Sequence, residues 1–133
     1  MSTVMKPKVI STDKAPGAVG PYSQGMNAGP FIYVSGQLPI NPATGEHYKE
    51  IEQAARQSLE NCKAIVEAGG GSLETIVKVE IFIRDISLFA RMNAVYAEFF
   101  GDHKPARAAV EVSKLPLDAV IEIQMVAFTG THS

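Results

Sequence analysis

The sequence predicts an α+β fold in which two helices cover one face of a six-stranded sheet. Two long segments, 49–68 and 87–100, carry hydrophobic residues at the spacing of an amphipathic helix. Six shorter segments alternate between apolar and polar residues, or are rich in β-branched residues, as strands are. In chain order the elements read β-β-β-α-β-α-β-β. Because no linker, repeat or low-complexity tract interrupts them, residues 1–133 are predicted to form a single domain.

The first three strands are expected at 8–11, 23–28 and 31–36. Residues 13–19 contain a proline and a glycine and should form a loop. Gly29 and Pro30 separate the second strand from the third and mark a tight turn between them.

Each predicted helix has a clear apolar face and an identifiable end. Gly69 begins a run of three glycines that ends the helix over 49–68, because glycine readily adopts the left-handed conformation of a helix C-cap. Asp85 or Ser87 could cap the first turn of the helix over 87–100. Residues that share the apolar face of this second helix are Leu88, Met92, Val95, Tyr96 and Phe99.

Three later strands, over 75–84, 106–112 and 119–128, alternate with period two. Val77, Val79, Ile81 and Ile83 are expected to face the helices. The opposite face would be too apolar to be fully solvated and too charged to form a second hydrophobic core within one chain. Such a mixed face suits an interface between copies of the chain. A monomer with one solvated sheet face is the alternative. If the alternation keeps register, this open face carries Lys78, Glu80, Phe82, Arg107, Glu111, Glu122 and Gln124 among Ile76, Val120 and Val126.

Composition excludes several classes of protein. Hydrophobic residues make up 46% of the 133, and 12 Lys and Arg against 14 Asp and Glu give a net charge of −2. These values exclude a disordered chain and disfavour a nucleic-acid-binding protein, which needs a basic surface. The single cysteine, Cys62, excludes a disulfide framework. The sequence has no secretory signal and no apolar run that could span a membrane, so the chain is expected in the cytoplasm. Targeting to an organelle by a short segment is the alternative.

Two charged residues are candidates for chemistry. Arg107 is flanked by alanines at 106, 108 and 109, which leave space around a planar group whose donors match a carboxylate. A structural ion pair with a glutamate is the alternative. Glu122 lies between two isoleucines, so it is either paired, exposed, or held with a raised pKa that suits proton transfer.

Other polar residues give weaker signals. Tyr22 and Ser35 lie in glycine-bordered segments, where turn chemistry alone can explain them, and Asn93 lies in mid-helix, where it could simply face water. Metal binding is not predicted, because no pair of histidines has the spacing of metal ligands. The histidines are His47, His103 and His132.

Five segments, in order and spacing, resemble a known family. They are 20–24 (Gly-Pro-Tyr-Ser-Gln), 34–39 (Val-Ser-Gly-Gln-Leu-Pro), 105–112 (Pro-Ala-Arg-Ala-Ala-Val-Glu-Val), 115–116 (Leu-Pro) and 121–123 (Ile-Glu-Ile). Any one of these segments alone would be weak evidence for a family, but the five together are specific to one. Over nearly its whole length the chain resembles the Rid family of imine deaminases, also called YjgF-like.

The resemblance implies a chorismate-mutase-like fold with a mixed sheet, and a homotrimer whose sheets line a central barrel with pockets at the subunit junctions. It also implies an activity: hydrolysis of reactive 2-imino acids, formed from 2-aminoacrylate and 2-aminocrotonate, to 2-keto acids and ammonia. The family's chemistry needs no metal and no cofactor. The partners that the resemblance implies are small 2-imino and 2-keto acids.

By position, the resemblance implies that Arg107 binds the substrate carboxylate. Glu122, together with the main-chain carbonyl of Ala109, would position or activate the attacking water. The residues that would line the pocket are Tyr22, Ser35, Gly36 and Asn93. Many members of the family have cysteine where this chain has Ala109. If that position acts through its carbonyl, the side chain matters little.

Two other functions stay open. A non-catalytic trimer could bind small carboxylates in the same pocket for regulation, and the alanine at 109 gives this alternative some weight. A ribonuclease or translation inhibitor is disfavoured by the net charge of −2.

Overall fold

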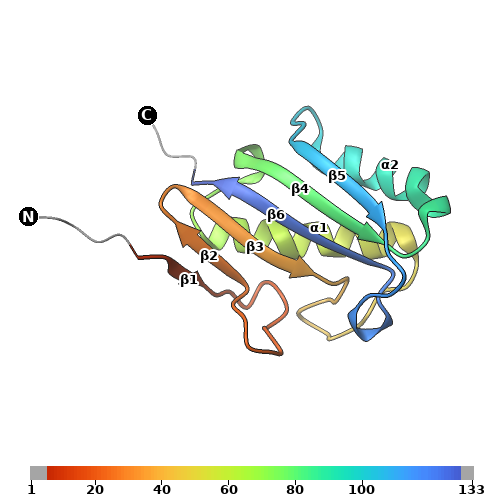
Figure 1. Ribbon diagram of the computed structural model, residues 1–133, viewed down its shortest axis with the longest axis horizontal. Coiled ribbons are helices and arrows are strands. Elements are labelled where there is room, and N and C mark those ends of the chain that lie inside the picture. Colours follow the sequence, from red (N-terminus) through yellow and green to blue (C-terminus); the bar gives the residue numbers. More distant parts are fainter. Residues whose placement is uncertain (1–5, 130–133) are drawn as a thin grey trace, which may run out of the picture.

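The computed structural model describes residues 6–129, and it confirms the predicted order of helices and strands (Figure 1). Each element begins and ends within two residues of its predicted position. In chain order the elements are β1 (Lys8–Ile10), β2 (Gly25–Ala28), β3 (Phe31–Gln37), α1 (Ile51–Ala68), β4 (Ile76–Ile83), α2 (Phe89–Phe100), β5 (Ala106–Glu111) and β6 (Ile121–Phe128).

The six strands form one sheet in the order β1-β2-β3-β6-β4-β5. Neighbouring strands are antiparallel except β4 and β5, which are parallel, so the sheet is mixed. A parallel pair needs a long crossover connection, and α2 provides it. Figure 1 shows α1 and α2 on the same face of the sheet, which confirms the predicted α+β architecture.

The core lies between the helices and this covered face of the sheet. The stripe predicted for α1 is buried there, including Leu59, Cys62 and Ile65. The Cys62 thiol donates a hydrogen bond to the carbonyl of Ile123 on β6, at 3.3 Å, and burial raises its pKa. A thiol in this environment is a core residue rather than a nucleophile.

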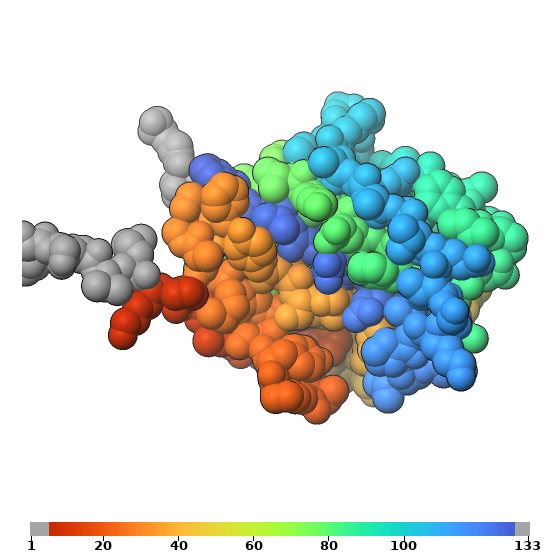
Figure 2. All heavy atoms as spheres, viewed as in Figure 1, coloured from red at the N-terminus to blue at the C-terminus, as the bar shows by residue number. Residues whose placement is uncertain are grey.

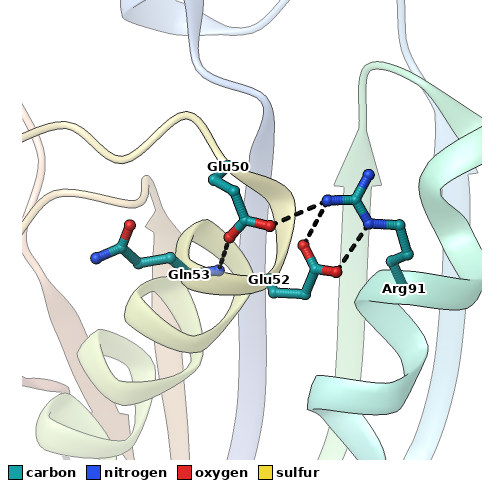
Figure 3. A network of polar contacts seen from close by, with 4 residues as sticks. All are labelled: Glu50, Glu52, Gln53 and Arg91. Carbon is teal, nitrogen blue, oxygen red and sulfur yellow. Dashed lines mark hydrogen bonds and ion pairs between the residues drawn. The ribbon is translucent and has the colours of Figure 1, made fainter.

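A group of charged side chains joins the start of α1 to α2 (Figure 3). Glu50 caps α1, because its carboxylate accepts a hydrogen bond from the backbone N–H of Gln53 at 3.0 Å. Arg91 of α2 donates to Glu50 at 3.0 Å and to both carboxylate oxygens of Glu52, at 2.7 and 2.8 Å. These contacts hold α2 against α1 on the side of the molecule opposite the open sheet face.

Two expectations about the sheet faces were wrong at β4. The pairing of β4 with β6 shifts register between Ile76 and Lys78, which is a β-bulge. The bulge reverses the alternation at its start, so Ile76 is fully buried and Val77 is 45% exposed.

Two expectations about β5 were also wrong. Arg107 and Glu111 lie on the helix-covered side of the sheet, not on the open face. They pair with Val79 and Ile83, which are buried beneath the helices, and Glu111 accepts a hydrogen bond from the backbone N–H of Ile86, at 3.0 Å. The side chains of β5 that face away from the helices are those of Ala106, Ala108 and Val110.

Across residues 6–129, neither helix combines the length and hydrophobicity that crossing a bilayer requires.

Candidate active site

Arg107 lies over the aromatic side chains of α2. Its guanidinium carbon is 4.6 Å from the centre of the Tyr96 ring and 5.4 Å from that of Phe89. Its Nη1 donates a hydrogen bond to the side-chain oxygen of Asn93, at 2.5 Å. Among the described residues no carboxylate pairs with it. No ion pair of this kind forms within the described residues, and the cation is held by neutral groups that leave it able to bind an anion.

The spacing of these three residues on α2 explains their convergence. Phe89, Asn93 and Tyr96 follow one another at steps of four and three, so they share one face of the helix. The sequence predicted Tyr96 only as a core residue. The spacing of Tyr96 among apolar residues can be read from the sequence. The register of the strand that carries Arg107 cannot, so the contact between the two residues was not predicted.

Ala109 lies two residues further along β5, on the edge of the sheet. The backbone N–H of Val112 donates to the carbonyl of Ile83 on β4, at 2.9 Å. Because the N–H and C=O groups of successive residues point alternately to the two sides of a strand, the carbonyls of Ala109 and Arg107 point to the free edge. The carbonyl of Ala109 is thus available to an outside partner, whichever side chain the residue carries.

Glu122 lies on the open face of β6, against Gly36 of β3. A methyl group built on Gly36 would collide with the Glu122 carboxylate, so glycine is needed for this close approach. Glu122 is partly buried and has no salt bridge to any described residue, and burial raises the pKa of its carboxyl. A carboxyl of this kind can exchange protons closer to neutral pH than an exposed one.

Ser35 and Gln24 shape the segment that carries Tyr22. The Ser35 hydroxyl donates to the carbonyl of Ser23 at 2.6 Å, so it holds the neighbouring chain. The side chain of Gln24 is buried and binds backbone groups of the preceding loop at both ends of its amide. Tyr22, half exposed, is presented at the tip of this braced segment.

Four of the predicted site residues fall into two separate pockets of the chain, whereas Ser35, Ala109 and Glu122 line neither pocket. Arg107, Asn93 and Tyr96 line a pocket of about 360 Å³ beside α2. Tyr22 and Gly36 line another, of about 340 Å³, where three loops meet at the end of β3 (Figures 1 and 2). Within one copy of the chain, then, the arginine and the tyrosine do not share a pocket.

Within residues 6–129 no group of three side chains could hold a metal ion, and His132 lies outside the described residues.

The chain is similar to known proteins over most of its length. Residues 12–129 match the family described as endoribonuclease L-PSP. A 2-iminobutanoate/2-iminopropanoate deaminase from Escherichia coli is 50% identical over 123 residues, which are 90% of this chain and 96% of the relative.

Two solved structures from Escherichia coli have the same fold. The YjgF gene product superimposes with a TM-score of 0.88 at 49% identity, and TdcF with bound serine with a TM-score of 0.88 at 46% identity. Each comparison covers 91% of this chain and 98% of the other. The chain therefore belongs to the endoribonuclease L-PSP family, the YjgF-like or Rid proteins that its five segments resemble.

Proposed function

We propose that the chain is an imine deaminase that hydrolyses 2-imino acids to 2-keto acids and ammonia. The observation that carries the proposal is the Arg107 guanidinium, held by two rings and an amide with no carboxylate partner among the described residues. Such a cation is suited to the carboxylate that every 2-imino acid bears. The name of the Escherichia coli relative supports the same reaction.

The proposed reaction needs only groups that the chain supplies. With the substrate carboxylate on Arg107, the imine carbon is presented to a water molecule held by Glu122 and the Ala109 carbonyl. Glu122 accepts a proton from the water as its oxygen bonds to the imine carbon, and returning that proton to the imine nitrogen gives the carbinolamine. Glu122 then takes the hydroxyl proton as the C=O bond forms and delivers it to nitrogen, so that the C–N bond breaks and ammonia leaves. Burial raises the pKa of Glu122 and so makes its carboxylate a stronger base for accepting these protons.

We further propose that the active form is a homotrimer in which each site combines the Arg107 pocket of one copy with the Tyr22 and Gly36 pocket of the next. The separation of the two pockets within one chain supports this, because the proposed groups cannot otherwise meet one substrate. The open sheet face offers an interface, since it carries exposed apolar side chains alongside a Gln124–Glu80 hydrogen bond of 2.6 Å (Figure 2). These apolar side chains are Phe31, Tyr33, Val110 and Phe128.

Light scattering during gel filtration tests the assembly, and the expected mass is three times that of the 14.3 kDa chain. A monomer at micromolar concentration would contradict the trimer. We also propose a cytoplasmic location, which suits a chain whose one cysteine is a buried, unpaired thiol.

Trapping of the imine tests the reaction. A pyridoxal-phosphate-dependent dehydratase acting on threonine supplies the imine, and semicarbazide competes with the protein for it. The wild-type chain should release the keto acid and suppress the semicarbazone, whereas Arg107→Ala should lower kcat/KM by about 100-fold, because it removes charged hydrogen bonds to the carboxylate. Arg56→Ala is the matched control, since Arg56 pairs with Glu98 between the helices.

The alternatives give different results in this assay. A regulatory carboxylate-binding trimer would bind 2-ketobutyrate saturably through Arg107 but leave the trapping rate unchanged. Ribonuclease activity, which the family's description mentions, is not proposed, because the chain carries a net charge of −2.

A further inference from the structure

The loop between β5 and β6 contains a strained turn. Leu117 and Asp118 both have φ of 57°, and across residues 6–129 they are the non-glycine residues with positive φ. This left-handed conformation is unfavourable for a leucine, and it persists only where surrounding contacts enforce it. A strained turn on the rim of a pocket indicates that the position of its side chain matters.

Distant parts of the chain enforce the turn through Asp118. Lys49 donates a hydrogen bond to its main-chain carbonyl at 2.7 Å, and Arg84 pairs with its carboxylate at 2.6 Å. The backbone N–H of Ala119 also donates to the carbonyl of Pro116, at 3.2 Å, which closes the turn. The loop is thus fixed from two sides, yet the Leu117 side chain takes no part in the core, since 60% of it is exposed.

Leu117 instead forms a wall of the pocket that contains Tyr22 and Gly36. In Figure 2 the blue loop around residue 117 and the orange loop around residue 20 flank this pocket. Among its described lining residues none is Asp, Glu, Lys or Arg, and the wall is shared between apolar and polar side chains. The apolar side chains are Pro16, Val19, Leu38, Ile40, Pro42 and Leu117, and the polar ones are Tyr22, Gln24, Gln37, Asn41 and His47.

The pocket is also adjacent to the proposed chemistry, because Gly36, one of its lining residues, lies directly against the Glu122 carboxylate. A substrate whose carboxylate is on Arg107 and whose imine carbon is near Glu122 has one substituent left, its side chain. A wall without Asp, Glu, Lys or Arg suits an aliphatic side chain of the substrate. A charged side chain would lose its hydration there without gaining an ion-pair partner.

We infer that Leu117 is a specificity-determining residue that contacts the side chain of the imino acid, and that the site favours uncharged aliphatic chains longer than a methyl group. The inference rests on the proposed function and names the substrate class of the same site. It also explains the strained turn, because this backbone conformation holds the Leu117 side chain against the substrate.

The test compares imines that differ only in their side chains. An amino-acid oxidase supplies them from alanine and norvaline, and kcat/KM is measured for each with semicarbazide as competitor. Leu117→Asn should lower the norvaline-to-alanine ratio by about three- to tenfold, because a lost apolar contact weakens only the longer chain. Asparagine tolerates the left-handed conformation, so this variant keeps the turn. Leu117→Met and Ile86→Asn should keep the wild-type ratio, since Ile86 is 44% exposed and does not line this pocket.

Calorimetric binding of pyruvate, 2-oxopentanoate and 2-oxoglutarate separates this inference from the proposed function. Loss of all hydrolysis by the wild type would refute the deaminase, yet a Leu117-dependent preference for 2-oxopentanoate over pyruvate would still support the pocket assignment. An unchanged ratio in Leu117→Asn, or binding of 2-oxoglutarate as tight as that of 2-oxopentanoate, would overturn it.

Discussion

The guanidinium of Arg107 lies 4.6 Å from the centre of the Tyr96 ring, close enough for a cation–π contact, while the hydroxyl of the same tyrosine is buried with no hydrogen-bond partner among the described residues. The ring therefore carries the interaction with the arginine, and the hydroxyl contributes nothing visible to it. Two substitutions at this position separate the ring from the hydroxyl.

Tyr96→Phe should keep kcat/KM within about twofold of wild type and should leave the midpoint of thermal unfolding unchanged or higher, because it removes an unsatisfied buried hydroxyl. Tyr96→Leu should raise KM by about two- to fivefold, since the guanidinium loses one of its two rings. Steady-state kinetics and calorimetry measure both effects. A wild-type KM in Tyr96→Leu would show that the ring does not position Arg107.

Gly36→Ala should lower kcat by about 10- to 100-fold, because the added methyl group displaces the Glu122 carboxylate and the general acid–base step is lost. The cost in unfolding free energy should stay near 1 kcal/mol, since the end of a glutamate side chain can move. The same substitution in a Glu122→Ala background is the control. A further large loss of kcat there would mean that Gly36 acts independently of Glu122.

Glu122→Gln should remove a pH dependence of stability. Burial raises the pKa of this carboxyl in the folded chain above its value in the unfolded chain. Its contribution to stability is therefore present below the unfolded pKa and is lost as pH rises through the folded pKa. Relative to wild type, the variant should gain stability in urea unfolding as the pH rises above about 4, the usual pKa of an unfolded glutamate. Parallel stability curves for the two proteins would contradict a raised pKa.

Ala109→Cys should change kcat/KM by less than about threefold. The proposed role belongs to the main-chain carbonyl, which the free edge of β5 leaves accessible, and both residues have that carbonyl. The trapping assay with the threonine-derived imine measures the effect. A gain of tenfold or more in the cysteine variant would show that a thiol takes part in the reaction.

Local patterns in the sequence were enough to predict the architecture. The apolar stripe of α1, the glycines at its end and the cap at Asp85 are signals within one turn of the residues that they organise. The cap lies at the start of a short 3-10 turn before α2, where the Asp85 side chain accepts from the backbone N–H of Ser87 at 3.0 Å.

The faces of β4 and β5 could not be predicted in the same way. The bulge at Val77 depends on pairing with β6, and the position of Arg107 depends on a parallel register with β4 that only the packed crossover sets. The candidate residues themselves were found by type and motif. Their division between two pockets, and the support that Tyr96 gives to Arg107, come from contacts between residues far apart in the chain.

The division of the site between two pockets has a genetic consequence if the trimer is correct. A copy that lacks Arg107 would still lend its intact Tyr22 side to a neighbour, and a copy altered at Gly36 would still lend its arginine. Coexpression of two such inactive alleles should therefore restore some activity by complementation. A single defective allele beside a normal one should leave about half of the activity, because each faulty copy disables only the site to which it gives its altered side.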